Sequence, residues 1–141
     1  MLHKRHKYDL IVILAVFNLA VSLYLAITKI LGLPVPCTIT RGCEVVLNSK
    51  YSVLLGVPLP ILGIIFYSAI IVLALLANHY HKAGRLLTLA LGIGSLFSLS
   101  FLSIQLFVLK HFCEYCLATD SITILLFLWD LNIERPRQPT A

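Results

Sequence analysis

The sequence predicts an all-α membrane protein, a bundle of four helices that cross the bilayer, and two observations support this fold class. The 141-residue chain is 60% hydrophobic and 12% charged, with a mean hydropathy of +0.96, whereas apolar residues make up about 45–50% of soluble domains. The apolar residues also gather into four stretches, each close to the roughly 20 residues that a membrane-spanning helix needs. We expect one membrane domain over residues 1–141, with membrane helices at 10–31, 59–77, 86–109 and 114–133.

The positive charges predict how these helices are oriented. A net charge of +5 can indicate nucleic-acid binding in a soluble protein, but here the basic residues are concentrated on one predicted side, as the positive-inside rule describes. We therefore expect no nucleic acid as a partner, a multi-pass protein of the plasma membrane with cytoplasmic termini, and a long extracytoplasmic loop between the first two helices. The concentrated charges are Lys4, Arg5, Lys7, Lys82, Arg85, Arg135 and Arg137, and the sparser ones opposite are Lys29, Arg41, Lys50 and Lys110.

The first helix, over 10–31, is expected to stay in the membrane. Its apolar run is too long for the central region of a signal peptide, and no small-residue cleavage site follows it. It carries Asn18 at mid-depth, where an amide usually forms a hydrogen bond to another helix.

The loop that follows holds the first two cysteines. Pro34 and Pro36 end the helix, and Cys37 and Cys43 are spaced to close a small disulfide loop. Such a disulfide can be structural, although it closes few residues and so provides limited entropic stabilisation. On an exposed segment it can instead be a reducible, redox-active pair.

The second and third helices, over 59–77 and 86–109, are rich in small residues. Gly63, and Gly92 with several serines after it, allow close helix packing, and Pro60 is tolerated near a helix start. Gln105 can pack within the bundle or donate a hydrogen bond to a bound carbonyl group.

The last helix begins with the C-x-x-C pair Cys113 and Cys116. A helix N-terminus stabilises a thiolate, which favours a redox dithiol, although a C-x-x-C can also be half of a zinc site or a structural disulfide. The predicted topology places all four cysteines on the extracytoplasmic side, where disulfides persist. Asp120 follows Cys116 by one helical turn and shares its face, and a carboxyl group inside a membrane segment usually has a function.

Together these residues resemble the vitamin K epoxide reductase family, specifically its prokaryotic members that oxidise protein thiols. The resemblance covers nearly the whole chain, and the combination of its parts is specific. It rests on the four spans, the loop pair Cys37 and Cys43, Ser49 six residues later, the Gly56-Val-Pro58-Leu segment before the second span, Gly63, Tyr67, and the C-x-x-C.

The resemblance implies a quinone-linked oxidoreductase that forms disulfides. Electrons would pass from a thioredoxin-like partner through Cys37 and Cys43 to Cys113 and Cys116, and then to a membrane quinone of the menaquinone, ubiquinone or phylloquinone type. Many prokaryotic relatives carry this partner as a fused domain, and because this sequence ends at Ala141 we expect a separate protein.

For the quinone contacts we select Cys116, Asp120, Gln105, Ser49 and Tyr67. In vertebrate relatives an Asn near the start of the second span and a Tyr after the C-x-x-C contact the quinone. Leu59 and Asp120 align with these two positions.

Three other interpretations are alternatives to a quinone-linked oxidoreductase. A non-catalytic membrane protein with structural disulfides is the main alternative, and the resistance of such disulfides to glutathione distinguishes it. We expect no metal, because the first cysteine pair lacks the usual zinc spacing and an oxidising compartment disfavours persistent thiolates. A channel or transporter is weakly supported, since no span carries a strong charge near its middle.

Overall fold

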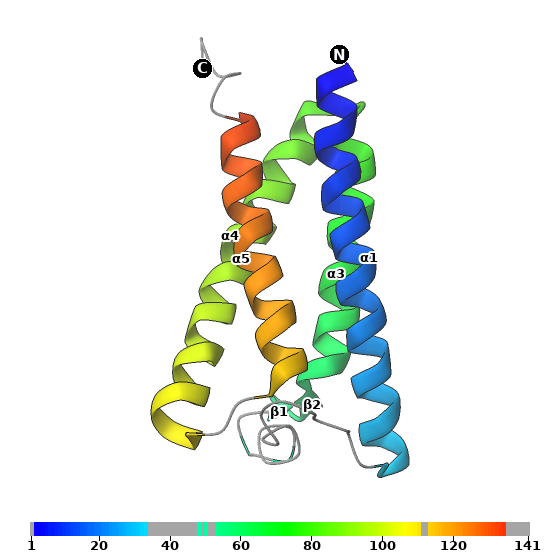
Figure 1. Ribbon diagram of the computed structural model, residues 1–141. Coiled ribbons are helices and arrows are strands. Elements are labelled where there is room, and N and C mark those ends of the chain that lie inside the picture. The colour runs from blue at the N-terminus through cyan, green and yellow to red at the C-terminus, as the bar shows by residue number, and fades with distance from the viewer. Residues whose placement is uncertain (1, 34–47, 49, 51–52, 111–112, 135–141) are drawn as a thin grey trace.

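The described part of the protein is all-α apart from one short hairpin (Figure 1). The computed structural model describes residues 2–33, 48, 50, 53–110 and 113–134. Its elements, in order, are α1 (Leu2–Leu31), β1 (Val53–Leu54), β2 (Val57–Pro58), α3 (Leu59–Ala77), α4 (His81–Ser103), the π-helix η2 (Ile104–Leu109) that continues α4, and α5 (Glu114–Glu134).

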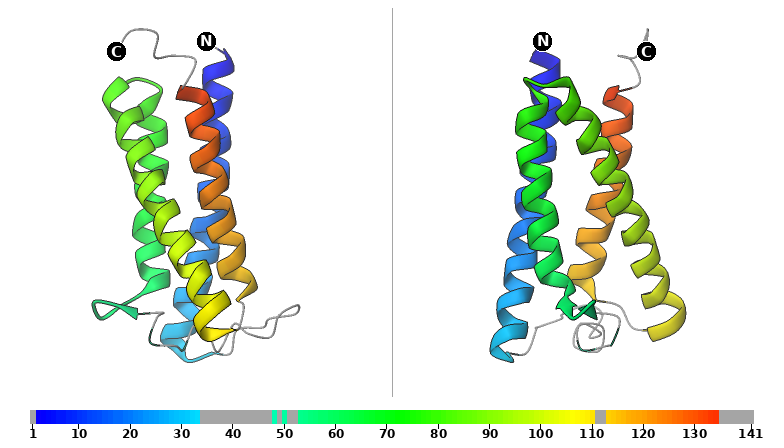
Figure 2. Two further views of the ribbon diagram at one scale, coloured as in Figure 1. Left: turned by 90° about the vertical axis from the view of Figure 1, so that its left-hand side faces the viewer. Right: turned by 180° about the vertical axis from the view of Figure 1, so that it is seen from behind.

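The four long helices form an up-and-down bundle. The start of α1 and the end of α5 lie at one end, and the hairpin and the start of α5 lie at the other (Figure 1). α1 packs most extensively against α3, and α4 packs against α5. Seen from behind, α4 leans away from α3 toward the hairpin end, while α3 stays beside α1 (Figure 2).

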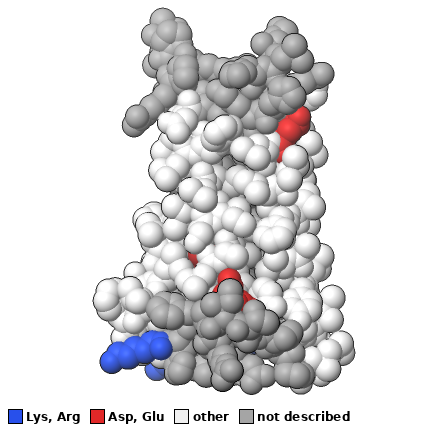
Figure 3. All heavy atoms as spheres, in the orientation of Figure 1, with Lys and Arg blue, Asp and Glu red and all other residues white. Residues whose placement is uncertain are grey.

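Three of the described helices are long and apolar enough to cross a membrane, namely Tyr8–Leu31, Leu59–Ala77 and His81–Leu109. α5 is of similar length but contains Asp120 and Asp130, and its crossing of the membrane stays a prediction, as does the orientation of the termini. On the face shown in Figure 3, the coloured charged side chains lie toward the two ends, and a broad uncharged band separates them. The prediction of an all-α, multi-helix membrane protein is therefore confirmed, and the count of four spans stays a prediction.

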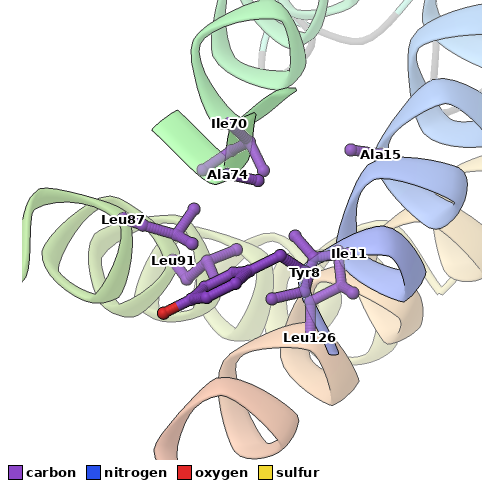
Figure 4. Close-up of a cluster of buried hydrophobic side chains, with 8 residues drawn as sticks. All are labelled: Tyr8, Ile11, Ala15, Ile70, Ala74, Leu87, Leu91 and Leu126. Atoms are coloured by element: carbon purple, nitrogen blue, oxygen red, sulfur yellow. The ribbon is translucent and has the colours of Figure 1, made fainter. Parts of the chain in front are cut away.

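A hydrophobic cluster joins all four helices near the end where α1 begins (Figure 4). Close by, Asp130 of α5 is fully buried and accepts a hydrogen bond from the Thr88 hydroxyl of α4. This hydrogen bond offsets part of the free-energy cost of burying the carboxyl group. The buried members of the cluster are Tyr8, Ile11 and Ala15 of α1, Ile70 and Ala74 of α3, Leu87 and Leu91 of α4, and Leu126 of α5.

A tight hairpin immediately precedes α3, and the sequence analysis did not predict it. β1 and β2 pair antiparallel, and the two residues between them, Leu55 and Gly56, have φ values of 55° and 85°. Positive φ at both central positions is typical of the type I′ hairpin turn. Glycine adopts a positive φ freely, but leucine rarely does, so the sequence at this turn only weakly indicates a hairpin. The hairpin sets where α3 begins, at Leu59, with Pro60 at its second position.

Candidate functional site

The C-x-x-C pair lies at the start of α5, in a water-excluded setting. Cys113 is fully buried and Cys116 nearly so, and both are free thiols. The Cys116 backbone N–H donates to the Cys113 sulfur at 3.3 Å. Leu25 of α1 and Phe101 of α4 are buried against the two sulfurs. The pair is therefore held by the first turn of α5 and shielded by two other helices.

The two thiols are not equivalent. Hydrogen bonding by the Cys116 side chain lowers the pKa of the Cys113 thiol, and this outweighs burial, which acts in the opposite direction. In the reduced pair, Cys113 is thus the sulfur that ionises more readily. When Cys113 is joined to another cysteine, Cys116 is the thiol that remains.

A π-helical segment brings Gln105 to the cysteine pair. Gln105 is fully buried, and its Oε1 accepts a hydrogen bond from the backbone N–H of Cys113 at 3.0 Å. Its Nε2 has no hydrogen-bond partner in the described part of the chain. π-helical turns are rare and often mark functional sites, and this one ends at Lys110, which is left-handed at φ 55°. Gln105 therefore fixes the position of Cys113 at the start of α5.

An apolar cavity of about 270 Å³ lies beside Cys116. Side chains from α1, α3, α4 and α5 and from β1 line it, and Cys116 and Asp120, one turn apart on α5, share its wall. Cys113 and Gln105 are not among the lining residues, so Cys116 is the sulfur that faces the space. The described residues that line it are Ser22, Leu25, Leu54, Leu59, Pro60, Leu62, Gly63, Phe66, Tyr67, Ile93, Gly94, Phe97, Ser98, Phe101, Cys116, Thr119, Asp120 and Thr123.

A small network of hydrogen bonds holds the side chains of one wall of the cavity in place. The Thr123 hydroxyl donates to the carbonyl oxygen of Thr119 at 2.8 Å. The Thr123 hydroxyl oxygen lies 2.7 Å from the Tyr67 hydroxyl oxygen. Because the Thr123 hydrogen is already donated to Thr119, the Tyr67 O–H donates to the Thr123 oxygen. Asn18 of α1 donates to the same Thr119 carbonyl at 3.4 Å, as expected for an interhelical amide. Sequence reasoning did not select Thr119 or Thr123, although their spacing from Cys116 places all three on one helical face.

The site thus brings together three of the residues that the sequence predicted, Cys116, Asp120 and Tyr67. Gln105 contacts Cys113 instead of the cavity, and its role toward a bound carbonyl stays a prediction. Cys37, Cys43 and Ser49 lie outside the described residues.

Several apolar helices with a buried dithiol beside a cavity define a membrane protein suited to thiol redox chemistry. The model of the vitamin K epoxide reductase family matches residues 9–131. The chain belongs to this family, and it is therefore a multi-pass membrane protein of an oxidoreductase family that is generally associated with quinones. Leu59 and Asp120, which the sequence analysis aligned with the two quinone-contacting positions of vertebrate relatives, both line the cavity.

Proposed function

We propose that the protein is a quinone-dependent thiol oxidoreductase that forms disulfides in other proteins. The observation that carries this proposal is the position of Cys116, which is paired with Cys113 at the start of α5 and faces an apolar cavity. A structural disulfide needs no such cavity, whereas a dithiol that reduces a membrane-soluble acceptor does.

The cavity fits a quinone ring in size and chemistry. Phe66, Phe97 and Phe101 supply flat apolar walls, and the Ser22 hydroxyl group can donate to a carbonyl oxygen. Ligand pockets usually measure about 300–1,000 Å³, so a cavity of about 270 Å³ suits a ring without its hydrocarbon tail.

The cavity also reaches the lipid-facing surface. Ile93 and Phe97 of α4 line it, yet they are 67% and 45% exposed. An apolar tail attached to a ring in the cavity can therefore extend into the membrane. When bound, a quinone supplies the capacity to take up two electrons and two protons.

The cysteines carry the electrons in two exchanges. We assign Cys37 as the loop sulfur that a reduced partner thiolate attacks, and Cys43 as the thiolate released from the loop disulfide. Cys43 then attacks Cys113, and Cys116 leaves as a thiolate that takes up a proton beside the cavity. The second thiol of the partner resolves the mixed disulfide with Cys37, and Cys37 then resolves the disulfide between Cys43 and Cys113, which leaves Cys113 and Cys116 as a dithiol. Buried contacts to Leu25 and Phe101 keep water away from the inner pair, and Gln105 holds Cys113 in place.

The partner in this proposal is a separate thioredoxin-like dithiol protein on the extracytoplasmic side of the plasma membrane. The orientation rests on the distribution of Lys and Arg, with the termini cytoplasmic.

Proteoliposomes that contain the protein and a quinone test this function. A reduced thioredoxin-like protein added outside should gain a disulfide for each quinone reduced, over many turnovers. Thiol oxidation that does not depend on quinone, or no oxidation in vesicles whose protein is folded, would contradict the proposal.

A substitution at Gly94 tests whether the cavity holds the quinone. A Cβ at this position would overlap the Phe66 ring, so Gly94→Ala should displace that ring into the cavity. Overpacking costs about 1–3 kcal/mol, and we expect quinone binding to weaken by about 5- to 150-fold, measured by quinone titration of the purified protein.

Gly92→Ala is the matched control for this substitution. Its Cβ would lie 3.2 Å from Phe127, which does not line the cavity. It should disturb the packing of α4 against α5 and leave quinone affinity close to that of the wild type. Equal losses of affinity in the two variants would contradict this location of the site.

A further inference from the structure

Among the residues that the structure describes, Asp120 is the only carboxyl group that lines the cavity. Its Oδ2 is buried and has no hydrogen-bond partner in the described part of the chain. Ser98 of α4 is close enough to the carboxyl group to form a hydrogen bond with it. Asp120 therefore has one oxygen that can be oriented by a neighbour and another that is available to a ligand or a proton.

The titratable groups near Asp120 belong to the redox site. Cys116 is one turn earlier on α5, Cys113 precedes that turn, and Tyr67 faces it from α3. The lining residues that α1 and α4 present to the cavity, including Ser22 and Ser98, do not titrate. Among the described residues that line the cavity there is no Lys or Arg, so none of these offers an ion pair to the carboxylate.

Such a carboxyl group is expensive to keep at membrane depth, where ionisable residues are usually functional. A second buried acid on the same helix shows a different arrangement. Asp130 is hydrogen-bonded to Thr88 and does not line the cavity. The two acids of α5 thus differ in that only Asp120 is open to the space beside Cys116.

We propose that Asp120 is a proton-transfer residue, which takes the proton of the Cys116 thiol and passes it to an oxygen of the bound quinone. This inference rests on the proposed function. Overall, the Cys113 and Cys116 S–H bonds break, one S–S bond forms, and the quinone gains two electrons and two protons. Asp120 carries the Cys116 proton and returns to its carboxylate form. The Cys113 proton is released to the bulk solvent, and the bulk solvent supplies the second proton that the quinone takes up.

Infrared difference spectroscopy of the quinone-free protein tests the link between Asp120 and Cys116. Reducing the Cys113 to Cys116 disulfide should make a carboxyl C=O band appear, because in the reduced, quinone-free protein Asp120 takes the Cys116 proton and has no acceptor to pass it to. The band should shift in D₂O, disappear in Asp120→Asn, and persist in Asp130→Asn. A difference spectrum without a carboxyl band, or a band that survives in Asp120→Asn, would overturn the inference. If Asp120→Asn does not fold, ¹³C labelling of aspartate assigns the band in a protein that carries Asp9→Asn and Asp130→Asn, in which Asp120 is the one aspartate left.

Kinetics supply the second measurement. In Asp120→Asn, which keeps the size of the side chain, quinone reduction should slow by about 10²- to 10⁴-fold, the usual contribution of acid–base catalysis. The quinone dissociation constant should stay within about threefold, and Asp120→Glu should recover part of the rate. A wild-type rate in Asp120→Asn, or a loss explained by weaker quinone binding, would contradict proton transfer. A wild-type protein that reduces no quinone while showing the infrared band would instead refute the proposed function.

Discussion

Replacing Cys116 by serine should abolish quinone reduction, leaving only the uncatalysed reaction between thiols and quinone. Cys116 is the sulfur that faces the cavity, and without it no disulfide can form with Cys113. Cys113→Ala should also stop turnover, but it leaves the Cys116 thiol beside the quinone. In that variant the absorption spectrum of bound quinone should still be perturbed.

These two variants form a matched pair, because each removes one sulfur from the same helical turn. Spectra of both proteins with saturating quinone, recorded next to the wild type, measure the difference. A perturbed spectrum in Cys116→Ser together with an unperturbed one in Cys113→Ala would reverse the roles of the two cysteines.

Loss of either loop cysteine should affect turnover with a protein donor and turnover with a small dithiol differently. Cys37→Ser and Cys43→Ser should block electron transfer from a thioredoxin-like protein and spare turnover with dithiothreitol, which can reduce the inner pair directly. Initial rates with both donors measure this. If both donors lose activity equally, the loop cysteines do not act as a relay, and a structural loop disulfide is favoured.

The same variants should trap intermediates of the relay. Each exchange passes through a mixed disulfide that the neighbouring thiol resolves, so Cys43→Ser should accumulate an adduct between Cys37 and the partner. Similarly, Cys116→Ser should favour a disulfide between Cys43 and Cys113. Non-reducing peptide mapping identifies both species. An adduct at Cys43 in Cys37→Ser, with none at Cys37 in Cys43→Ser, would show that electrons enter at the other sulfur.

The sequence predicted the features that depend on local pattern. The second helix was expected over 59–77, and α3 covers Leu59–Ala77, because its apolar run is bounded by a proline-containing start and a polar turn. The shared face of Cys116 and Asp120 follows from helical periodicity, and both residues line the cavity. α4 begins at His81, earlier than the predicted span at 86, since a helix can extend beyond the apolar segment.

Features that depend on the tertiary structure were not predictable from the sequence. The contact between Gln105 and Cys113 requires a π-helical turn and a left-handed residue at Lys110, and neither has a reliable local signal. The hydrogen bond between Tyr67 and Thr123 joins residues far apart in the chain. The volume of the cavity depends on how four helices pack, which periodicity alone does not determine.

The most direct test of quinone reduction by the inner cysteine pair is an anaerobic single turnover. The purified protein is fully reduced, freed of reductant and mixed with one equivalent of quinone, while quinone absorption and the alkylation of Cys113 and Cys116 are followed together. We expect one quinone to be reduced for each Cys113 to Cys116 disulfide formed, at the same rate, in a protein that also carries Cys37→Ser and Cys43→Ser. If the quinone stays oxidised, or is reduced while both cysteines remain thiols, the inner pair does not reduce the quinone.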